Sequence, residues 1–179
     1  DSFARIMSLM ENESPWIKDK TFLEKFVGIC LKQIEKFNTS NQKYKNKLIG
    51  CLDECLQASA MGLSAEQELL VEEALMAQLN SNLESVSQNQ NLFDNDKFTS
   101  FDEKKDTEKQ TLSTIMNCFK TLTTLWPYLK NQAAVFKICR GKYATTNFLV
   151  RNSILKMISA VAKAVGKEDQ NRPAFNSEL

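Results

Sequence analysis

Apolar residues recur at three- and four-residue spacings along most of this chain, and polar residues fill the positions between them. This spacing is typical of helices that bury one face. It is clearest from Leu112 to Leu122, just before Trp126-Pro127, a pair that ends or bends a helix. The spacing predicts seven helices: a short one within residues 3–10, four over about 15–38, 41–60, 64–80 and 106–126, a short one that stops at Gly141, and one over 145–165.

The spacing also indicates which faces these helices bury. For the second helix the expected buried face is Phe22, Phe26, Ile29, Cys30, Gln33 and Phe37. In the fourth helix the apolar residues spread widely around the circumference, which predicts burial on more than one side. These residues are Leu69, Leu70, Leu75, Met76 and Leu79.

Polar stretches and cap residues set the expected boundaries. Ser64 to Gln67 fits a capping box at the start of the fourth helix, and Asp106 is expected to cap the fifth. Residues 81–106 hold many Asn, Ser, Gln and Asp, which predicts a frayed helix end and then a long mobile loop between two helical halves. Residues 167–179 predict a flexible tail. We expect a single helical domain over residues 1–179.

Consecutive helices joined by short connections pack most simply as antiparallel hairpins. No alternating strand pattern competes with the helical one. The predicted fold is therefore all-α, with about seven helices packed as antiparallel hairpins. A HEAT-like or armadillo-like stack and an irregular helical bundle are both compatible with this pattern, because no fixed-period repeat is evident.

Composition narrows the classes of function. The 179 residues are 42% hydrophobic and 25% charged, as in an ordinary folded domain, and 5 Gly and 3 Pro are too few for a turn-rich β protein. No signal-peptide pattern and no bilayer-spanning apolar run is present, which predicts an intracellular protein, cytoplasmic or nuclear. The chain has no His. Ser-His-Asp catalysis, Cys-His catalysis and His-ligated zinc are therefore excluded.

Five cysteines, at positions 30, 51, 55, 118 and 139, fall within apolar helical patterns. We expect them to be reduced and buried. Cys51 and Cys55 share a helix face beside Asp53 and Glu54, so a redox pair, a soft-metal site or a thiol nucleophile is an alternative. Nearby acids raise a thiol pKa, which favours the structural interpretation. We predict no catalytic residue, no cofactor and no metal site. The paired acids Glu72-Glu73 are expected on the surface.

Charge is segregated along the chain although the formal net charge is only +1. Residues 109–167 contain no Asp or Glu but eight Lys and two Arg, whereas residues 48–108 contain 13 acids and three bases. One interpretation is that the two segments pair with each other in the fold. The other is that a basic face binds an acidic protein, an anionic membrane or nucleic acid.

Seven residues of the basic segment are candidates for binding an anionic partner: Lys130, Lys137, Arg140, Lys142, Arg151, Lys156 and Lys163. Lys156 and Lys163 lie on one polar stripe of the last helix, and Lys25, Lys32 and Lys36 form another stripe on the second helix. Arg151 falls between Leu155 and Ile158 in the apolar arc. It must therefore pair, extend to solvent or reach a partner, and internal pairing is the preferred interpretation.

Three hypotheses follow. The leading one is a non-catalytic helical protein–protein interaction module of a larger scaffold or adaptor, whose partner has an acidic surface. The second is an electrostatic binder of anionic membrane lipid or nucleic acid through residues 109–167. Membrane binding would need apolar anchors beside the lysines, and the predicted helices use theirs in the core. The third is a cysteine-dependent enzyme around Cys51, such as a bacterial-type ubiquitin ligase with a Cys-x-Asp motif.

Overall fold

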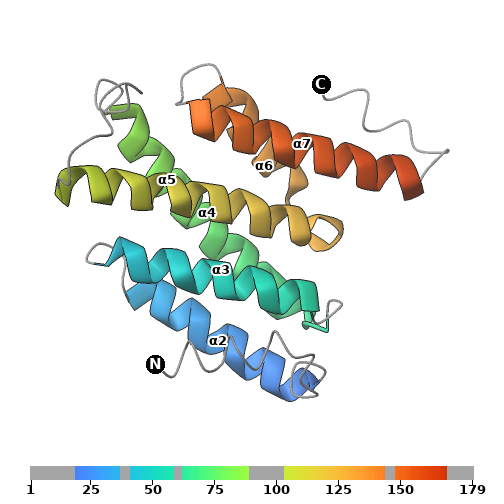
Figure 1. Ribbon diagram of the computed structural model, residues 1–179. Coiled ribbons are helices and arrows are strands. Elements are labelled where there is room, and N and C mark those ends of the chain that lie inside the picture. The colour runs from blue at the N-terminus through green and yellow to red at the C-terminus, as the bar shows by residue number, and fades with distance from the viewer. Residues whose placement is uncertain (1–18, 37–40, 59–61, 89–102, 144–147, 169–179) are drawn as a thin grey trace.

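The computed structural model describes residues 19–36, 41–58, 62–88, 103–143 and 148–168 (Figure 1). Its helices are α2 (Lys20–Lys36), α3 (Gln42–Ala58), α4 (Ala65–Gln88), α5 (Glu103–Thr124), the 3-10 helix η3 (Trp126–Tyr128), α6 (Gln132–Tyr143) and α7 (Phe148–Glu168). These residues contain no strand, so the all-α prediction is confirmed. None of these helices has the length and apolar character needed to cross a bilayer. The short helix expected within residues 3–10 lies outside the described residues.

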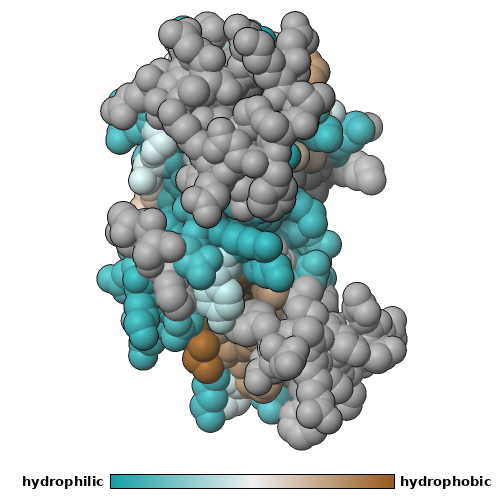
Figure 2. All heavy atoms as spheres, turned by 60° about the vertical axis from the view of Figure 1, so that its left-hand side comes forward, coloured by the Kyte–Doolittle hydropathy of each residue, from teal (hydrophilic) through white to brown (hydrophobic). Residues whose placement is uncertain are grey.

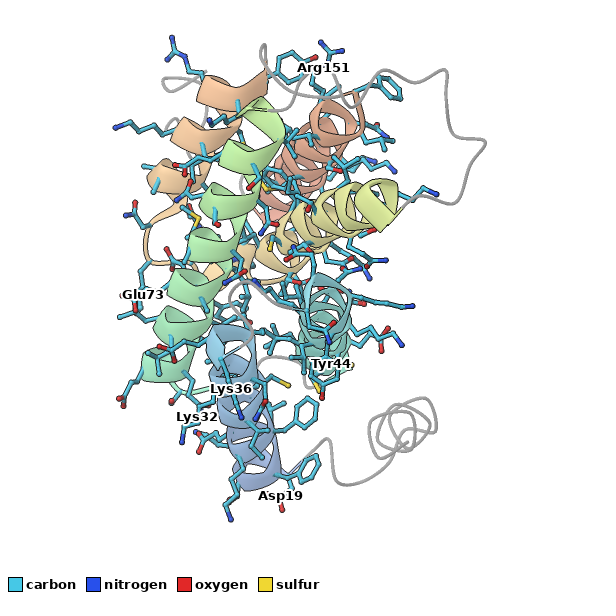
Figure 3. The ribbon with its side chains drawn as sticks, turned by 90° about the vertical axis from the view of Figure 1, so that its left-hand side faces the viewer. Asp19, Lys32, Lys36, Tyr44, Glu73 and Arg151 are labelled. Carbon is cyan, nitrogen blue, oxygen red and sulfur yellow. The ribbon has the colours of Figure 1, made fainter. Side chains whose placement is uncertain are left out.

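The helices form three antiparallel hairpins stacked in two layers. Figure 1 shows α3, α5 and α7 side by side in one layer, all running in the same direction, and Figure 3 shows α2, α4 and α6 on the other side. Each helix packs mainly against helices one or two places away in chain order, as α5 does against α3 and α7. The HEAT or armadillo type of this stack stays a prediction.

The central helix of the stack is α5, which contacts α3, α4 and α7. Four residues of the predicted apolar spacing are buried, Leu112, Ile115, Phe119 and Leu122, together with Cys118. They belong to one core cluster that extends from α2 to α7. Met116, which also fits that spacing, is exposed. After Thr124 the chain turns through η3, where the buried Trp126 meets Phe136 of α6 edge-on, with ring centroids 5.0 Å apart. The predicted helix end at Trp126-Pro127 is confirmed.

A row of polar contacts, which we call the polar seam, joins α3 to α5. The Gln42 amide donates a hydrogen bond to the Thr114 hydroxyl (2.9 Å), and the Asn117 amide donates one to the Asn46 side chain. Further along, the Thr124 hydroxyl donates to Asp53 (2.8 Å). Residue numbers rise together on both helices, so α3 and α5 are parallel. Because an unmade buried hydrogen bond is costly, the polar seam fixes the register of the two helices.

Side-chain caps begin four helices. Backbone N–H groups of the first turn donate to Asp19 in α2, to Asn41 in α3, to Ser64 in α4 and to Asn131 in α6. Such caps satisfy donors that have no partner within the helix. The capping box expected at Ser64 forms only in part, because the Gln67 side chain donates to the Glu24 carbonyl (2.9 Å) of α2 instead.

The connection between α4 and α5 is shorter than the predicted loop over residues 81–106, because both helices extend into that stretch. α4 continues to Gln88, because Leu79, Leu83 and Val86 keep the three- and four-residue spacing and are buried. α5 begins at Glu103 rather than at Asp106. The rest of the expected loop, residues 89–102, lies outside the described residues.

Two predicted ends at the C-terminal side also need correction. Gly141 does not stop α6, which continues to Tyr143. A glycine stop needs a left-handed backbone, and Gly141 does not adopt one. α7 reaches Glu168, so the first two residues of the predicted tail 167–179 are helical. Residues 169–179 lie outside the described part of the chain.

The buried face of α2 is rotated from the expected one, and burial of α4 is narrower than expected. In α2 the residues Leu23, Phe26, Val27, Cys30 and Ile34 are buried, whereas Phe22 and Ile29 are exposed. In α4, Leu69 and Leu70 are exposed, so the prediction that they are buried is wrong. Both helices offer more apolar positions than their neighbours cover.

Glu72 is structural rather than a surface acid. Only 4% of it is exposed, and its carboxylate accepts backbone N–H bonds from Lys130 (2.7 Å) and Asn131 (3.0 Å). These donors lie at the start of α6, where a negative charge also favours the helix dipole. The carboxylate therefore fastens the α6/α7 hairpin to α4.

We predict that Glu72→Ala lowers the free energy of unfolding by about 1–3 kcal/mol, because two backbone donors lose a charged acceptor. Urea unfolding measures this difference. The matched control is Glu73→Ala, which removes an exposed neighbouring carboxylate and should change stability by no more than about 0.5 kcal/mol. Equal effects of the two substitutions would contradict the role assigned to Glu72.

Candidate functional site

A groove lies between α5 and α7, with Gln57 of α3 at one side. Its volume is about 420 Å³. Its apolar lining comes from Met116, Phe119, Met157 and Ala160, and Lys120 and Lys156 supply its two positive charges. The hydrophilic remainder is Gln57, Asn117, Thr123, Thr124 and Ser153. A groove of this kind can hold a partly apolar segment that carries negative charge.

Helical spacing brings these side chains to the groove. On α5 the residues Met116, Lys120 and Thr123 are four and three positions apart, so they share a face. On α7 the residues Lys156 and Ala160 are likewise four apart and face α5. The groove therefore follows from two parallel helices that each present a mixed polar and apolar stripe beside the core.

Asp53 anchors one of the two lysines. Its side chain has 0% exposure and accepts hydrogen bonds from Lys120 Nζ (2.8 Å), the Thr124 hydroxyl (2.8 Å) and the Gln57 amide (2.7 Å). The hydrogen bond to Asp53 raises the pKa of Lys120 above its ordinary value. Lys120 is thus held in place and positively charged, although 60% of its side chain is exposed.

The seven predicted binding residues are divided between two neighbouring helices. Lys130, Lys137, Arg140 and Lys142 lie in or just before α6, whereas Arg151, Lys156 and Lys163 lie on α7 in the other layer. Of the seven, Lys156 lines the groove. Lys142 and Arg151 are half-buried and the other five are exposed. The structure thus divides the candidates into an α6 group and an α7 group.

The acidic and basic segments meet directly at one buried acid. The Asp53–Lys120 ion pair joins the two segments, and a further ion pair, Lys20–Glu24 (4.0 Å), lies within α2. None of the seven candidates forms an ion pair with another described residue. The internal pairing expected for Arg151 is thus not found in this part of the chain.

The cysteines are buried, and none forms a disulfide. Burial raises the pKa of Cys51 to about 11 and that of Cys30 to about 12, and it also raises the pKa of Cys55. Glu54 adds to the rise at Cys51, as the sequence led us to expect. Such thiols are almost fully protonated at neutral pH and make poor nucleophiles. The described residues also contain no cluster of three or more potential metal ligands.

Sequence reasoning missed Lys120 and Asp53 as members of this site. In the sequence, Asp53 is notable only as a neighbour of Cys51. Its position on α3 between the buried Ile49 and Leu56 could have indicated its role, because a carboxylate among apolar residues needs hydrogen-bond donors around it. The sequence could not show that two of the three donors would come from α5, some 70 positions along the chain.

Comparison with protein-family models, curated proteins and solved structures gave no match to this chain. A functional assignment therefore depends on the residues of the chain itself.

We predict that Lys120→Met lowers stability by about 1 kcal/mol, because Asp53 loses its charged donor, while the matched groove variant Lys156→Met has little effect. The stabilisation by Lys120 should be fully present below the ordinary lysine pKa of 10.5, where the ammonium is charged. It should be lost as the pH rises through the raised pKa of Lys120 in the folded protein. Urea unfolding of the three proteins across this range measures it. Equal stabilities of the two variants would contradict the anchoring role.

We predict that the native protein reacts with iodoacetamide at least about a hundredfold more slowly than a free thiol, because few thiolates form and all five thiols are buried. Mass spectrometry counts the modified sites, with five expected in urea. Rapid modification of Cys51 in the native protein would contradict this prediction and favour the cysteine-dependent enzyme.

Proposed function

We propose that this chain is a non-catalytic helical interaction module, part of a scaffold or adaptor, that binds an acidic and partly apolar segment of another protein. The observation that carries the proposal is the groove between α5 and α7. Its apolar lining offers contact area, and Lys120 and Lys156 offer positive charge beside it. Protein segments combine those two features, and charge complementarity gives them specificity.

The charge distribution supports this proposal. The six basic side chains described on α6 and α7 form no ion pair with another described residue, so their field acts on approaching molecules. They are Lys137, Arg140, Lys142, Arg151, Lys156 and Lys163. Unpaired charge of one sign speeds association with an oppositely charged partner. Lys120 adds pre-organisation, because Asp53 holds it in place before any partner arrives.

The rival functions have less support. A nucleic acid would favour a continuous basic track, whereas the basic residues are divided between two layers. A thiol nucleophile at Cys51 would need a lowered pKa, and burial raises it. The proposal also includes an intracellular location, which five reduced thiols support.

The test is affinity capture from cell lysate at low and high salt, read by mass spectrometry. The groove variant Met116→Asp/Lys156→Glu changes two exposed groove residues. The matched control Leu70→Asp/Lys43→Glu makes the same charge change at exposed sites on α4 and α3. We expect a protein partner that is lost with the groove variant, kept with the control and partly kept at high salt, because apolar contact is not screened.

Two results would overturn the proposal. One is a protein partner that binds the groove variant as well as the wild type. The other is capture of salt-labile nucleic acid or lipid alone, lost equally with both variants, which would favour the electrostatic binder. Thermal unfolding of each variant confirms that it is folded.

A further inference from the structure

α7 carries two stripes with helix-packing spacing, and only one of them lies in the core. Val150, Ile154, Met157 and Val161 form the buried stripe. A second stripe, which we call the end stripe, consists of Phe148, Arg151, Leu155, Ile158 and Ala162, again spaced by three and four residues. This spacing is the pattern by which one helix packs against another. A helix with two such stripes can have neighbours on two sides.

The end stripe is largely uncovered. Phe148 is 59% exposed and Leu155 is 49% exposed, whereas Ile158 is half-buried and touches the core cluster. Large apolar side chains exposed in a row, with one edge already packed, mark a surface suited to a partner. Phe148 and Leu155 also correct the expectation that every helix uses its apolar residues in the core.

The position of α7 explains why this stripe lacks a neighbour. Figure 1 shows α7 as the outermost helix of its layer, and Figure 3 shows Arg151 at that end, pointing away from the other helices. α5, one place further in, packs against both α3 and α7. A further helix laid on the end stripe would give α7 the second neighbour that α5 already has.

Arg151 indicates the chemistry of that helix. Its side chain is half-buried in the middle of the apolar end stripe and forms no ion pair with any described residue. Covering the stripe with an apolar helix would bury the guanidinium without a counter-charge, at considerable cost. A carboxylate opposite Arg151 would remove this cost and form a charge-assisted hydrogen bond.

We propose that the end stripe is the docking site for an amphipathic helix of a partner protein, one whose apolar stripe contains an Asp or Glu facing Arg151. This site lies on the side of α7 away from the groove, which Ser153, Lys156 and Ala160 line. It is therefore a second surface, and it does not depend on the function proposed for the groove.

A second copy of this chain fits less well. At the other end of the stack, the exposed stripe of α2 is Phe22, Lys25, Ile29, Lys32 and Lys36. Figure 2 shows hydrophobic atoms low on the visible face, at the height of α2 and α3, below a hydrophilic band. An end-to-end contact between copies would bring three lysines toward Arg151, and like charges disfavour it.

A membrane surface also fits less well. A membrane-binding helix presents a broad apolar face and inserts it between lipid headgroups. The end stripe is narrow, because Asn152 and Ser159 follow it directly around α7 and Ala162 adds little apolar surface. A narrow stripe that ends in a small residue suits the close approach of another helix.

The test uses a phage-displayed library of helical peptides with the length of α7, 21 residues, selected against the whole chain. We expect binders with apolar residues at three- and four-residue spacing and an Asp or Glu within that stripe. Fluorescence anisotropy then measures their affinity for the wild type and for Arg151→Glu, Leu155→Asp, Phe148→Ser and the control Lys163→Glu.

Arg151→Glu should weaken binding at least about tenfold, and a peptide with Lys at the acidic position should restore it. Leu155→Asp and Phe148→Ser should weaken binding, while Lys163→Glu should not. The groove variant Met116→Asp/Lys156→Glu should bind these peptides normally, so failure of one proposal is distinguishable from failure of the other. Thermal unfolding confirms that each variant is folded.

Three results would overturn the proposal. The first is a selection that yields no binder. The second is binders whose affinity does not change with the Arg151 and Leu155 substitutions. The third is a peptide with Lys in place of the acid that fails to bind the Arg151→Glu variant more tightly than the original peptide does. Vesicles of phosphatidylcholine and phosphatidylserine form a separate arm. Vesicle binding that requires Arg151 and Leu155, without any helix binder, would assign the end stripe to a membrane instead.

Discussion

The packing of α3 against α5 depends on one buried carboxylate, that of Asp53. A carboxylate without exposed surface is tolerated only when donors surround it, and three do so here. Two of these donors, Lys120 and Thr124, come from α5. The charge is therefore fully satisfied at one register of the two parallel helices, and any slip along the axis would remove its ion pair with Lys120 and its hydrogen bond from Thr124. The position of α7 follows, because α7 packs on the same central helix.

The same carboxylate shapes the groove. Its three hydrogen-bond donors also line the groove between α5 and α7. They are Lys120, Thr124 and Gln57. A structural hydrogen-bond network thus forms one wall of the groove. Lys120 is already ordered by its ion pair, whereas Lys156 on the opposite side forms no ion pair with a described residue. On the proposed function, a bound carboxylate would meet an ordered ammonium at Lys120, whose charge Asp53 already balances, and an adjustable, unpaired charge at Lys156. The ordered donor would lower the entropy lost on binding.

The helices and their order could be predicted from the sequence, because burying an apolar face is the strongest constraint on each segment. Which apolar arc is buried could not always be predicted. Phe22 and Ile29 continue a regular pattern on α2, yet they are exposed because α2 is the outermost helix and its neighbours cover a different arc. Glu72 illustrates the converse case. Its buried role depends on two backbone N–H groups before α6, nearly 60 positions away, and no local pattern indicates such a contact.

The two ends of the stack explain why charge within an apolar stripe matters. A wholly apolar end would accept almost any helix, including the end of another copy, and stacked hairpins of this kind could then grow without limit. Arg151 on α7 and the lysine stripe of α2 place positive charge beside the exposed apolar residues at both ends. On the docking proposal above, an end-to-end contact between copies would bring like charges together, while an acidic helix would meet both an apolar surface and a counter-charge. Specificity at the end of such a stack would then have two sources. One is the repulsion of partners that carry like charge, and the other is the attraction of partners that carry opposite charge.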